Sequence, residues 1–250
     1  MFKLEVENTF DTLLKKFSKI TNKGYIKSVT PNKNGSGITL ENELGSTGGD
    51  FCIPDYRDIE IKAIRDYYDA LIGLFSSAPD GKYESATQWL CENYGTQDEN
   101  FKDVNVLSCS LKGKRKIKVG NYYFSIKIDY INQKIFLNIY DKRLNFLNND
   151  IYWDFDSLEE KLRRKMSKLA IITVKSKIYN SDRYYHYKKI NLYKLKSFAT
   201  FLKLIEDGII LISFKTGVYK SGKYIGKFHD HGTTFRISKK DIEKLYDKIY

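Results

Sequence analysis

The stretch PDYRDIEIKAIR, at residues 54–65, contains a short run in which apolar and charged residues alternate. Side chains on a β-strand alternate between its two faces, so Glu60 and Lys62 share one face. The opposite face carries only apolar side chains, those of Ile59, Ile61 and Ala63. The pattern predicts a strand over residues 59–64 that packs one face into a core. The chain must therefore build a sheet that presents an acid and a base together on the other face.

Two interpretations of Glu60 and Lys62 are open. In the first, the side chains form an ion pair on a solvated face. In the second, Asp55 and Glu60 bind one Mg²⁺ at the mouth of the strand, and the carbonyl of Ile61 adds a third oxygen. Lys62 then holds or polarises a water molecule aimed at phosphorus. A triplet of this kind does not decide the question by itself, because residues 159–161 supply a second one inside a predicted helix.

Strand and helix patterns intermix along the chain. Helical spacing predicts helices over residues 7–20, 38–45, 65–79 and 192–208 and a helix starting near Asp156 or Ser157. Alternating or continuous apolar runs predict further strands at 122–130, 134–141 and 169–179 and a hairpin in the tail, 209–237. Because these elements show no strict β-α-β repeat, we expect an α/β fold with a mixed central sheet flanked by helices. No internal repeat or low-complexity linker is present, which favours one domain, residues 1–250, with two lobes.

The overall composition indicates a polyanionic partner. The chain has a net charge of +12, 20 tyrosines and 15 phenylalanines, and cations with aromatic rings suit a phosphate-bearing ligand. A lysine-rich composition without functional meaning explains the charge equally well. No apolar run approaches the ~20 residues that a membrane span needs, and the N-terminus lacks a signal-peptide core. Three scattered cysteines, Cys52, Cys91 and Cys109, show neither a disulfide framework nor a zinc spacing, so we expect a reduced, cytoplasmic protein with no membrane contact.

The tail segment KFHDHGTTFRI, at residues 227–237, contains two of the three histidines of the chain. On a strand or tight turn, His229 and His231 share a face and Asp230 lies opposite. A zinc site lacks further ligands at suitable spacing, and a catalytic base lacks a paired serine or cysteine. For DNA reading, histidine can donate to guanine, Asp230 can accept from cytosine, and Arg236 can bind guanine bidentately. A surface hairpin without a role remains the other alternative, and the adjacent turn would meet phosphates through Lys220, Lys223 and Lys227.

Several separated segments together carry a family resemblance. GSGITLENELG at 35–45, PDYRDIEIKAIR, IYWDFDSL at 151–158 and KFHDHGTTFRI resemble the MvaI/BcnI restriction endonucleases in the same order. The resemblance extends more distantly to the mismatch-repair nicking enzyme MutH, within the PD-(D/E)xK nuclease superfamily. It covers most of the chain and implies a MutH-like fold. DNA would lie in a cleft between a catalytic lobe, about residues 1–165, and a recognition lobe, about 166–250.

The resemblance also implies roles for individual residues. Asp55 and Glu60 match the metal-binding carboxylates of the family, Lys62 matches its catalytic lysine, and Glu41 matches an additional acid on a helix. Glu43 competes with Glu41 for that role, although the Thr-Leu-Glu context favours Glu41. Without the resemblance, Glu41 would be interpreted as a solvated helix residue.

For base recognition, the resemblance assigns contacts with a CC-N-GG type site to His229, Asp230, His231 and Arg236. Lys215 and Tyr219 match family positions near the central base pair. In the basic turn, Lys223 is the expected phosphate contact. The resemblance implies an arginine in MvaI at the position where this chain has Lys215. Lysine lacks the planar fork of arginine and is not an equivalent reader.

The implied activity is that of a type II restriction endonuclease. It would hydrolyse phosphodiester bonds of double-stranded DNA with Mg²⁺ and leave a 5′-phosphate. One active site per chain implies a monomer that nicks the two strands in turn, in a system with a cognate DNA methyltransferase. Two alternatives remain, a MutH-like repair nickase that needs an activating partner and a non-catalytic DNA-binding protein.

Overall fold

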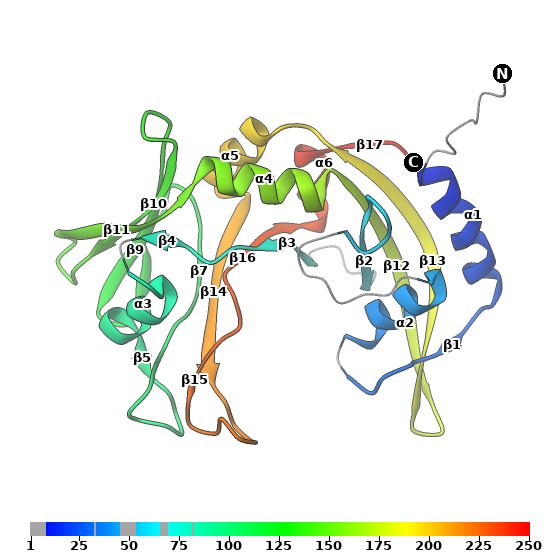
Figure 1. Ribbon diagram of the computed structural model, residues 1–250, viewed down its shortest axis with the longest axis horizontal. Coiled ribbons are helices and arrows are strands. Elements are labelled where there is room, and N and C mark those ends of the chain that lie inside the picture. Colours follow the sequence, from blue (N-terminus) through cyan, green and yellow to red (C-terminus); the bar gives the residue numbers. More distant parts are fainter. Residues whose placement is uncertain (1–8, 33, 46–53, 66–69, 82) are drawn as a thin grey trace. The chain divides into compact units, whose positions relative to one another are not determined.

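The computed structural model describes residues 9–32, 34–45, 54–65, 70–81 and 83–250, which form two compact units (Figure 1). Unit 1 contains the described residues of Met1–Ala70 together with Lys161–Lys196 and Ile242–Tyr250. Unit 2 contains Leu71–Glu160 and Ser197–Asp241. The units interleave along the sequence, whereas the predicted lobes are continuous. The assignment of catalysis and recognition to lobes on either side of a DNA cleft stays a prediction.

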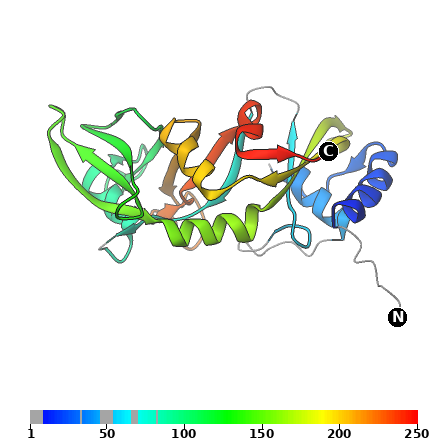
Figure 2. The ribbon, with the colours of Figure 1, turned by 90° about the horizontal axis from the view of Figure 1, so that it is seen from above.

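Unit 1 is built on a mixed sheet with the strand order β1-β13-β12-β2. Strand β17, red in Figure 2, lies beside β13. Strands β2 and β12 run parallel, while the other neighbours are antiparallel. The predicted mixed sheet is therefore confirmed. Its strands are β1 (Ile26–Lys27), β2 (Glu60–Arg65), β12 (Lys168–Tyr179), β13 (Asp182–Leu195) and β17 (Tyr246–Lys248).

One face of this sheet packs against two N-terminal helices, α1 (Thr9–Asn22) and α2 (Gly35–Leu44). The buried side chains of this core include Leu13 and Leu40 from the helices and Ile59 and Ile61 from the strand region, with Ala63 partly buried against them. The apolar face predicted for the strand is thereby confirmed. Gly45 ends α2 with a φ of 71°, a left-handed conformation that glycine adopts without steric cost.

Unit 2 contains two five-stranded sheets, ordered β4-β11-β10-β9-β8 and β15-β14-β16-β3 with β7 beside β14, and the small pair β5-β6. The strands predicted at residues 122–130 and 134–141 are confirmed as β9 and β10, which pair antiparallel as a hairpin. The strands of the unit are β3 (Leu71–Ser76), β4 (Asp80–Gly81), β5 (Thr96–Gln97), β6 (Asn105–Val106), β7 (Ser108–Leu111), β8 (Ile117–Val119), β9 (Tyr122–Asp129), β10 (Lys134–Tyr140), β11 (Phe146–Asp154), β14 (Ile210–Val218), β15 (Phe228–Asp230) and β16 (Thr234–Ser238).

The remaining helical elements connect these strands along the chain. They are α3 (Ala86–Tyr94), α4 (Phe155–Met166), α5 (Phe198–Glu206), the short 3₁₀ helix η1 (Lys239–Asp241) and α6 (Ile242–Leu245). No helix within the described ranges is both long and apolar enough to pass through a bilayer. Cys91 and Cys109 are free thiols, and Cys52 lies outside the described residues.

Two helix predictions need correction. The predicted helix over 65–79 is wrong, since residues 71–76 form strand β3 and residues 66–69 lie outside the description. Antiparallel pairing with β16 overrides the local helical spacing. The helix predicted over 192–208 is shorter, because residues 192–195 complete β13. Helix α5 begins only after Ser197, whose hydroxyl accepts a hydrogen bond from the backbone N–H of Thr200 at 3.0 Å.

Candidate functional site

The start of strand β2 brings Asp55 close to the strand backbone. The Asp55 carboxylate accepts a hydrogen bond from the backbone N–H of Ile61 at 2.9 Å. The N–H and C=O groups of one strand residue point to the same strand edge. The carbonyl of Ile61 therefore faces the Asp55 edge of β2 and points away from β12. Asp55 and the Ile61 carbonyl, two of the three predicted metal ligands, thus lie on one edge.

Glu60 is the buried centre of the cluster, with 1% of its side chain exposed. Lys62 donates a hydrogen bond to its Oε1 atom, and the ammonium of Lys165, on α4, lies 3.7 Å from the same oxygen. The other oxygen, Oε2, is buried and has no hydrogen-bond partner among the described residues. Burial raises the pKa of Glu60 and the nearby Asp55 carboxylate adds to this, whereas Lys62 and Lys165 oppose it.

Glu41, on α2, belongs to the same cluster. Burial raises its pKa, the Asp55 charge acts in the same direction, and Lys62 and Lys165 oppose them. The competing residue Glu43 instead pairs with Lys23 at 2.6 Å. The structure thus gathers the four predicted catalytic side chains, those of Glu41, Asp55, Glu60 and Lys62. Their catalytic roles stay predictions.

The donor set of this cluster fits Mg²⁺, which prefers oxygen ligands and keeps several waters. The unsatisfied Oε2 of Glu60 is the kind of buried acceptor that a cation would complete. Over the described ranges, no group of three or more His, Cys, Asp or Glu side chains is arranged to hold a metal ion. A cation at Asp55 and Glu60 would therefore also need backbone oxygen, water and substrate phosphate, which is the usual pattern for magnesium.

In unit 2, three aromatic rings form a column at the junction of β14 and β15. The ring of Tyr219 stacks on that of His229, with centroids 4.0 Å apart and planes 11° apart. The ring centroids of His229 and His231 are 4.1 Å apart. The predicted shared face of the two histidines is confirmed. Asp230 instead accepts a hydrogen bond from the backbone N–H of Gly232 at 2.7 Å.

Lys215 lies next to this column, since its carbonyl accepts a hydrogen bond from the backbone N–H of His231 at 3.0 Å. Burial lowers the pKa of His231, and the neighbouring His229 and Lys215 act in the same direction, so its neutral imidazole is favoured at pH 7. Arg236, on β16, pairs with Leu211 and therefore shares the β14 face of Lys215. Lys223 is exposed in the basic turn, beside the ring of Tyr224.

Two further features carried no recognisable sequence signal. One is Lys165, which contacts Glu60 although it lies on a helix far along the chain. The other is a row of hydroxyls that follows the paired positions of β7, β14, β16 and β3. The row contains two hydroxyl contacts, Ser110 to Ser213 at 2.9 Å and Ser76 to Thr234 at 3.1 Å. Isolated serines and threonines on separate strands do not indicate such a row until the register is known.

Comparisons with known proteins point to one family. A family model described as the MvaI/BcnI restriction endonuclease family matches residues 14–246. A solved structure described as a restriction endonuclease MvaI–cognate DNA substrate complex is 32% identical, with a TM-score of 0.87 and 98% of each chain covered. A structure of MvaI in the absence of DNA is 31% identical with a TM-score of 0.64, and the match covers 99% of this chain and 98% of that one. A search of curated proteins finds no match.

Proposed function

Because this chain belongs to the MvaI/BcnI restriction endonuclease family, we propose that it is a type II restriction endonuclease acting on double-stranded DNA. The observation that carries the proposal is the cluster of Asp55, Glu60 and Lys62 around an unsatisfied buried oxygen. A surface ion pair would not bury its carboxylate or leave an acceptor without a donor. The MutH-like character of the fold belongs to this proposal as well.

The proposed reaction is hydrolysis of a phosphodiester bond by water. When bound by Asp55, Glu60 and the Ile61 carbonyl, Mg²⁺ would supply a Lewis acid that stabilises charge on phosphate oxygen. Lys62 holds the attacking water and favours loss of its proton, while Lys165 adds a second cation beside Glu60. Glu41 adds a further acceptor for water at the cluster. Attack at phosphorus breaks the bond to the 3′ oxygen and leaves a 5′-phosphate.

For sequence recognition, we propose that the ring column and its neighbours read bases. Neutral His231 can donate or accept a hydrogen bond, Asp230 can accept from cytosine, and Arg236 can bind guanine bidentately. Lys215 and Tyr219 stand beside the column, and Lys223 is positioned in a turn suited to phosphate contact. A CC-N-GG type site remains the proposed target, with Lys215 in place of an arginine at the central base pair.

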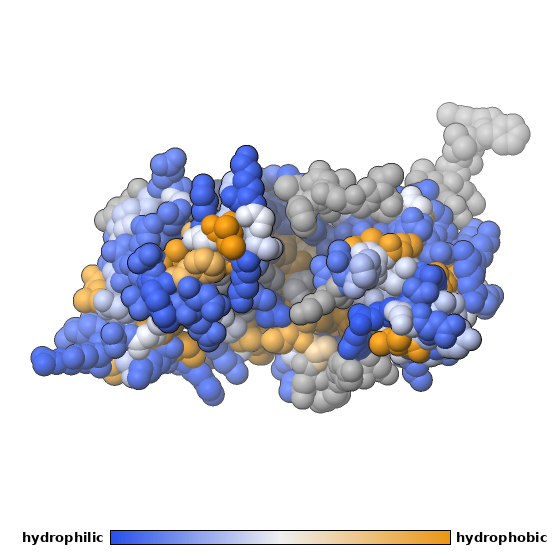
Figure 3. All heavy atoms as spheres, turned by 90° about the horizontal axis from the view of Figure 1, so that it is seen from below, coloured by the Kyte–Doolittle hydropathy of each residue, from blue (hydrophilic) through white to orange (hydrophobic). Residues whose placement is uncertain are grey.

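The surface chemistry supports DNA as the substrate. The face in Figure 3 is covered mainly by hydrophilic side chains, and the net charge of the chain is +12. A net positive charge of this size attracts phosphates independently of DNA sequence. We further propose that the protein acts as a monomer, nicks the strands in sequence, and works beside a DNA methyltransferase that protects the same site.

The catalytic assignment is tested with Asp55→Ala and Lys62→Ala. Both variants should bind cognate DNA but lose cleavage by about 10²-fold or more, because each removes a group that acts at the reacting phosphate. Cleavage is followed on DNA of known sequence with and without Mg²⁺, and fragment ends are mapped. Glu43→Ala is the matched control, since its side chain pairs with Lys23 outside the cluster. Wild-type cutting by either active-site variant would reject the assignment.

Recognition is tested separately with His231→Ala and Arg236→Ala. Each should weaken binding to the cognate site by about 1–3 kcal/mol, while salt-sensitive binding to unrelated DNA persists. Affinities for cognate and unrelated duplexes are measured at two salt concentrations. Unchanged cognate affinity in both variants would remove these residues from base reading.

A further inference from the structure

The hairpin of strands β12 and β13 carries much of the positive charge of the chain. Over residues 168–195 it has seven basic residues and one acid, Asp182, so its net charge of +6 is half of the +12 of the chain. The acid is already paired, because Lys27 on β1 lies 2.6 Å from it. The hairpin extends past α2 and ends in a tight turn at Asn180 and Ser181 (Figure 1). Both turn residues have a positive φ, 47° and 66°, as in the two-residue turns that hold hairpins in register.

One face of this hairpin continues the face that carries the catalytic cluster. Lys62 pairs with Ile171 on the neighbouring strand β12. Alternate residues of a strand share a face, so Thr173, Lys175 and Lys177 follow Ile171 on that side of the sheet. Ile171 and Thr173 are buried, whereas the two lysines are exposed. The face of the catalytic cluster therefore becomes a solvent-exposed basic surface farther along β12.

The exposed part of this face combines the two cations with rings from neighbouring strands and loops. Lys175 pairs with His186 across the hairpin, and Lys177 pairs with Tyr184. The ammonium of Lys177 lies 4.2 Å from the centre of the Tyr25 ring. In the part of the chain that the structure describes, neither lysine forms an ion pair with an acid. Their charges are therefore not neutralised within these residues and suit an anionic ligand.

The spacing along the strand indicates which phosphates these lysines would meet. Each strand residue advances about 3.3 Å, so Lys175 and Lys177 lie about 13 Å and about 20 Å along β12 from the level of Lys62. One DNA strand advances about 3.4 Å per nucleotide, so these separations correspond to about four to six nucleotides. The lysines are thus placed for phosphates that flank the cleaved one.

We propose that the exposed hairpin face around Lys175 and Lys177 binds the DNA backbone beside the recognition site, with one phosphate contact from each lysine. Such contacts carry no sequence information, but they fix the register and orientation of a duplex on the protein. On this hairpin they guide the cleaved phosphate to the catalytic cluster, because both lie on one sheet face. The inference rests on the proposed function, since it takes the substrate to be DNA that is cut at that cluster.

The test is the salt dependence of DNA binding by the double variant Lys175→Gln/Lys177→Gln. Affinity for an uncut cognate duplex with long flanks is measured without Mg²⁺ at several salt concentrations. The slope of log affinity against log salt should become shallower by about 2, because each lost phosphate contact removes about 0.9, and low-salt affinity should fall about tenfold or more. The matched control is Lys15→Gln/Lys19→Gln, which makes the same charge change at exposed positions of α1, on the opposite side of the sheet. Its slope should stay close to that of the wild type.

Duplex length separates a flanking contact from a general effect on the fold. A duplex that ends about two base pairs beyond the site lacks most of the flanking phosphates, so the hairpin variant should bind it as the wild type does. An unchanged slope on the long duplex would overturn the inference, as would an equal change in the α1 control or an equal loss on both duplexes. If Asp55→Ala and Lys62→Ala cleave normally, the proposed function fails. If they lose cleavage while the hairpin variant keeps the wild-type slope, only this inference fails.

Discussion

At the scale of single residues, the candidate active site is defined by one carboxylate in an unfavourable environment. Glu60 is almost completely buried, and its ionised form is opposed by burial and by Asp55. Two lysines compensate in part, and one carboxylate oxygen has no hydrogen-bond partner among the residues that the structure describes. Buried carboxylates of this kind lower the stability of the folded protein when no ligand is bound, and they are typical of functional sites.

The first prediction concerns the stability cost of Glu60. Its folded-state pKa is raised, so the folded protein holds this proton more tightly than the unfolded chain does. Below the unfolded pKa both states are protonated and nothing is lost, whereas stability falls as the pH rises through the folded pKa. Glu60→Gln should therefore raise the thermal midpoint at pH 7 without metal, by about 2–4 °C if the gain is about 1 kcal/mol.

Under the proposed function, Mg²⁺ would bind the folded wild type through Glu60, so the same variant should lose the stabilising effect of Mg²⁺. Calorimetry of both proteins at pH 4 and pH 7, with and without Mg²⁺, measures the two effects. The difference between the variants should shrink at pH 4, where the wild-type carboxyl is largely protonated. A lower midpoint for Glu60→Gln at pH 7 would show that the two lysines outweigh the burial cost.

The second prediction concerns Lys165, the cation that sequence patterns do not identify. Lys165→Gln should reduce cleavage by about 100-fold, because it removes a positive charge that faces the carboxylates. Arg164→Gln is the matched control, since it makes the same charge change at an exposed neighbouring position. Cleavage by the control should stay within about twofold of wild type. Equal losses in both variants would assign the effect to overall charge and not to position.

The extent to which the site could be predicted depends on its locality. Asp55, Glu60 and Lys62 lie within one short stretch, and strand alternation alone placed the last two on one face. Glu41 required the family resemblance, since a lone acid on a helix carries no pattern of its own. Lys165 reaches Glu60 through tertiary packing of distant segments, and no local periodicity encodes such a contact.

At the scale of elements, the predictions were correct where the apolar residues had a clear helical or strand period. They were wrong where pairing with a distant strand determined the secondary structure. Alternation identified β9 and β10, a continuous apolar run identified β12, and helical spacing identified α1 and α2. The apolar run at residues 71–76 fits either period, and its partner β16 lies far along the chain. The strand therefore could not be recognised without knowledge of the sheet.

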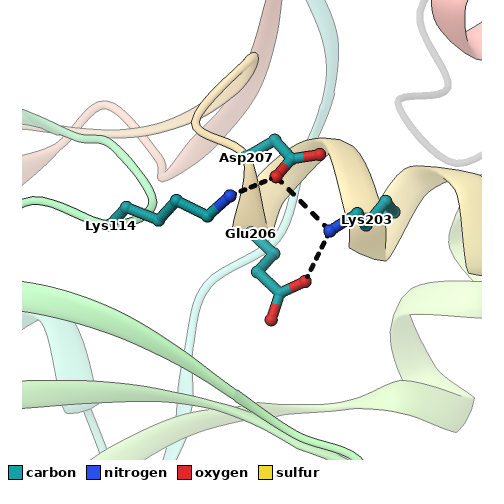
Figure 4. Close-up of polar contacts among 4 residues, drawn as sticks. All are labelled: Lys114, Lys203, Glu206 and Asp207. Atoms are coloured by element: carbon teal, nitrogen blue, oxygen red, sulfur yellow. Dashed lines mark hydrogen bonds and ion pairs between the residues drawn. The ribbon is translucent and has the colours of Figure 1, made fainter.

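The third prediction concerns the end of α5, where a close backbone approach requires glycine. A Cβ atom at Gly113 would lie 2.1 Å from the carbonyl oxygen of Ile205 and 2.3 Å from that of Glu206. An ion-pair network next to this contact joins Lys114 to Asp207 and Lys203 to Glu206 and Asp207 (Figure 4). These exposed pairs contribute little by themselves, so the backbone contact should dominate.

Gly113→Ala should therefore lower the free energy of unfolding by about 1–3 kcal/mol, because the loop and the helix end must separate. Urea unfolding followed by circular dichroism measures the change. The control is Gly73→Ala, where the nearest atom would be the Thr234 methyl at an ordinary 3.5 Å. A loss no greater than that of the control would show that the loop shifts freely.

At the scale of the whole molecule, the chain builds two units from interleaved segments. Strand β2 lies before the first segment of unit 2, residues 71–160, and its parallel partner β12 lies after that segment. The sheet of unit 1 therefore forms only across this long insertion. Among the residues that the structure describes, the cluster around Glu60 occurs once, in unit 1. Under the proposed function, a chain with one such cluster would cut one DNA strand in each catalytic event.

The last prediction follows from this single cluster. With supercoiled plasmid containing one cognate site, we expect an open-circular intermediate to accumulate before linear DNA, because one monomer must release or reorient between the two strands. The fraction of plasmid that passes through the open-circular intermediate should not change with protein concentration. Added salt should slow the association of the protein with DNA, because it weakens the attraction of a chain with charge +12 for phosphates. Gel analysis of the time course at several protein concentrations measures both effects, with a plasmid lacking the site as control. Direct conversion to linear DNA, at a rate that rises with the square of protein concentration, would instead indicate two chains that cut together, each supplying one active site.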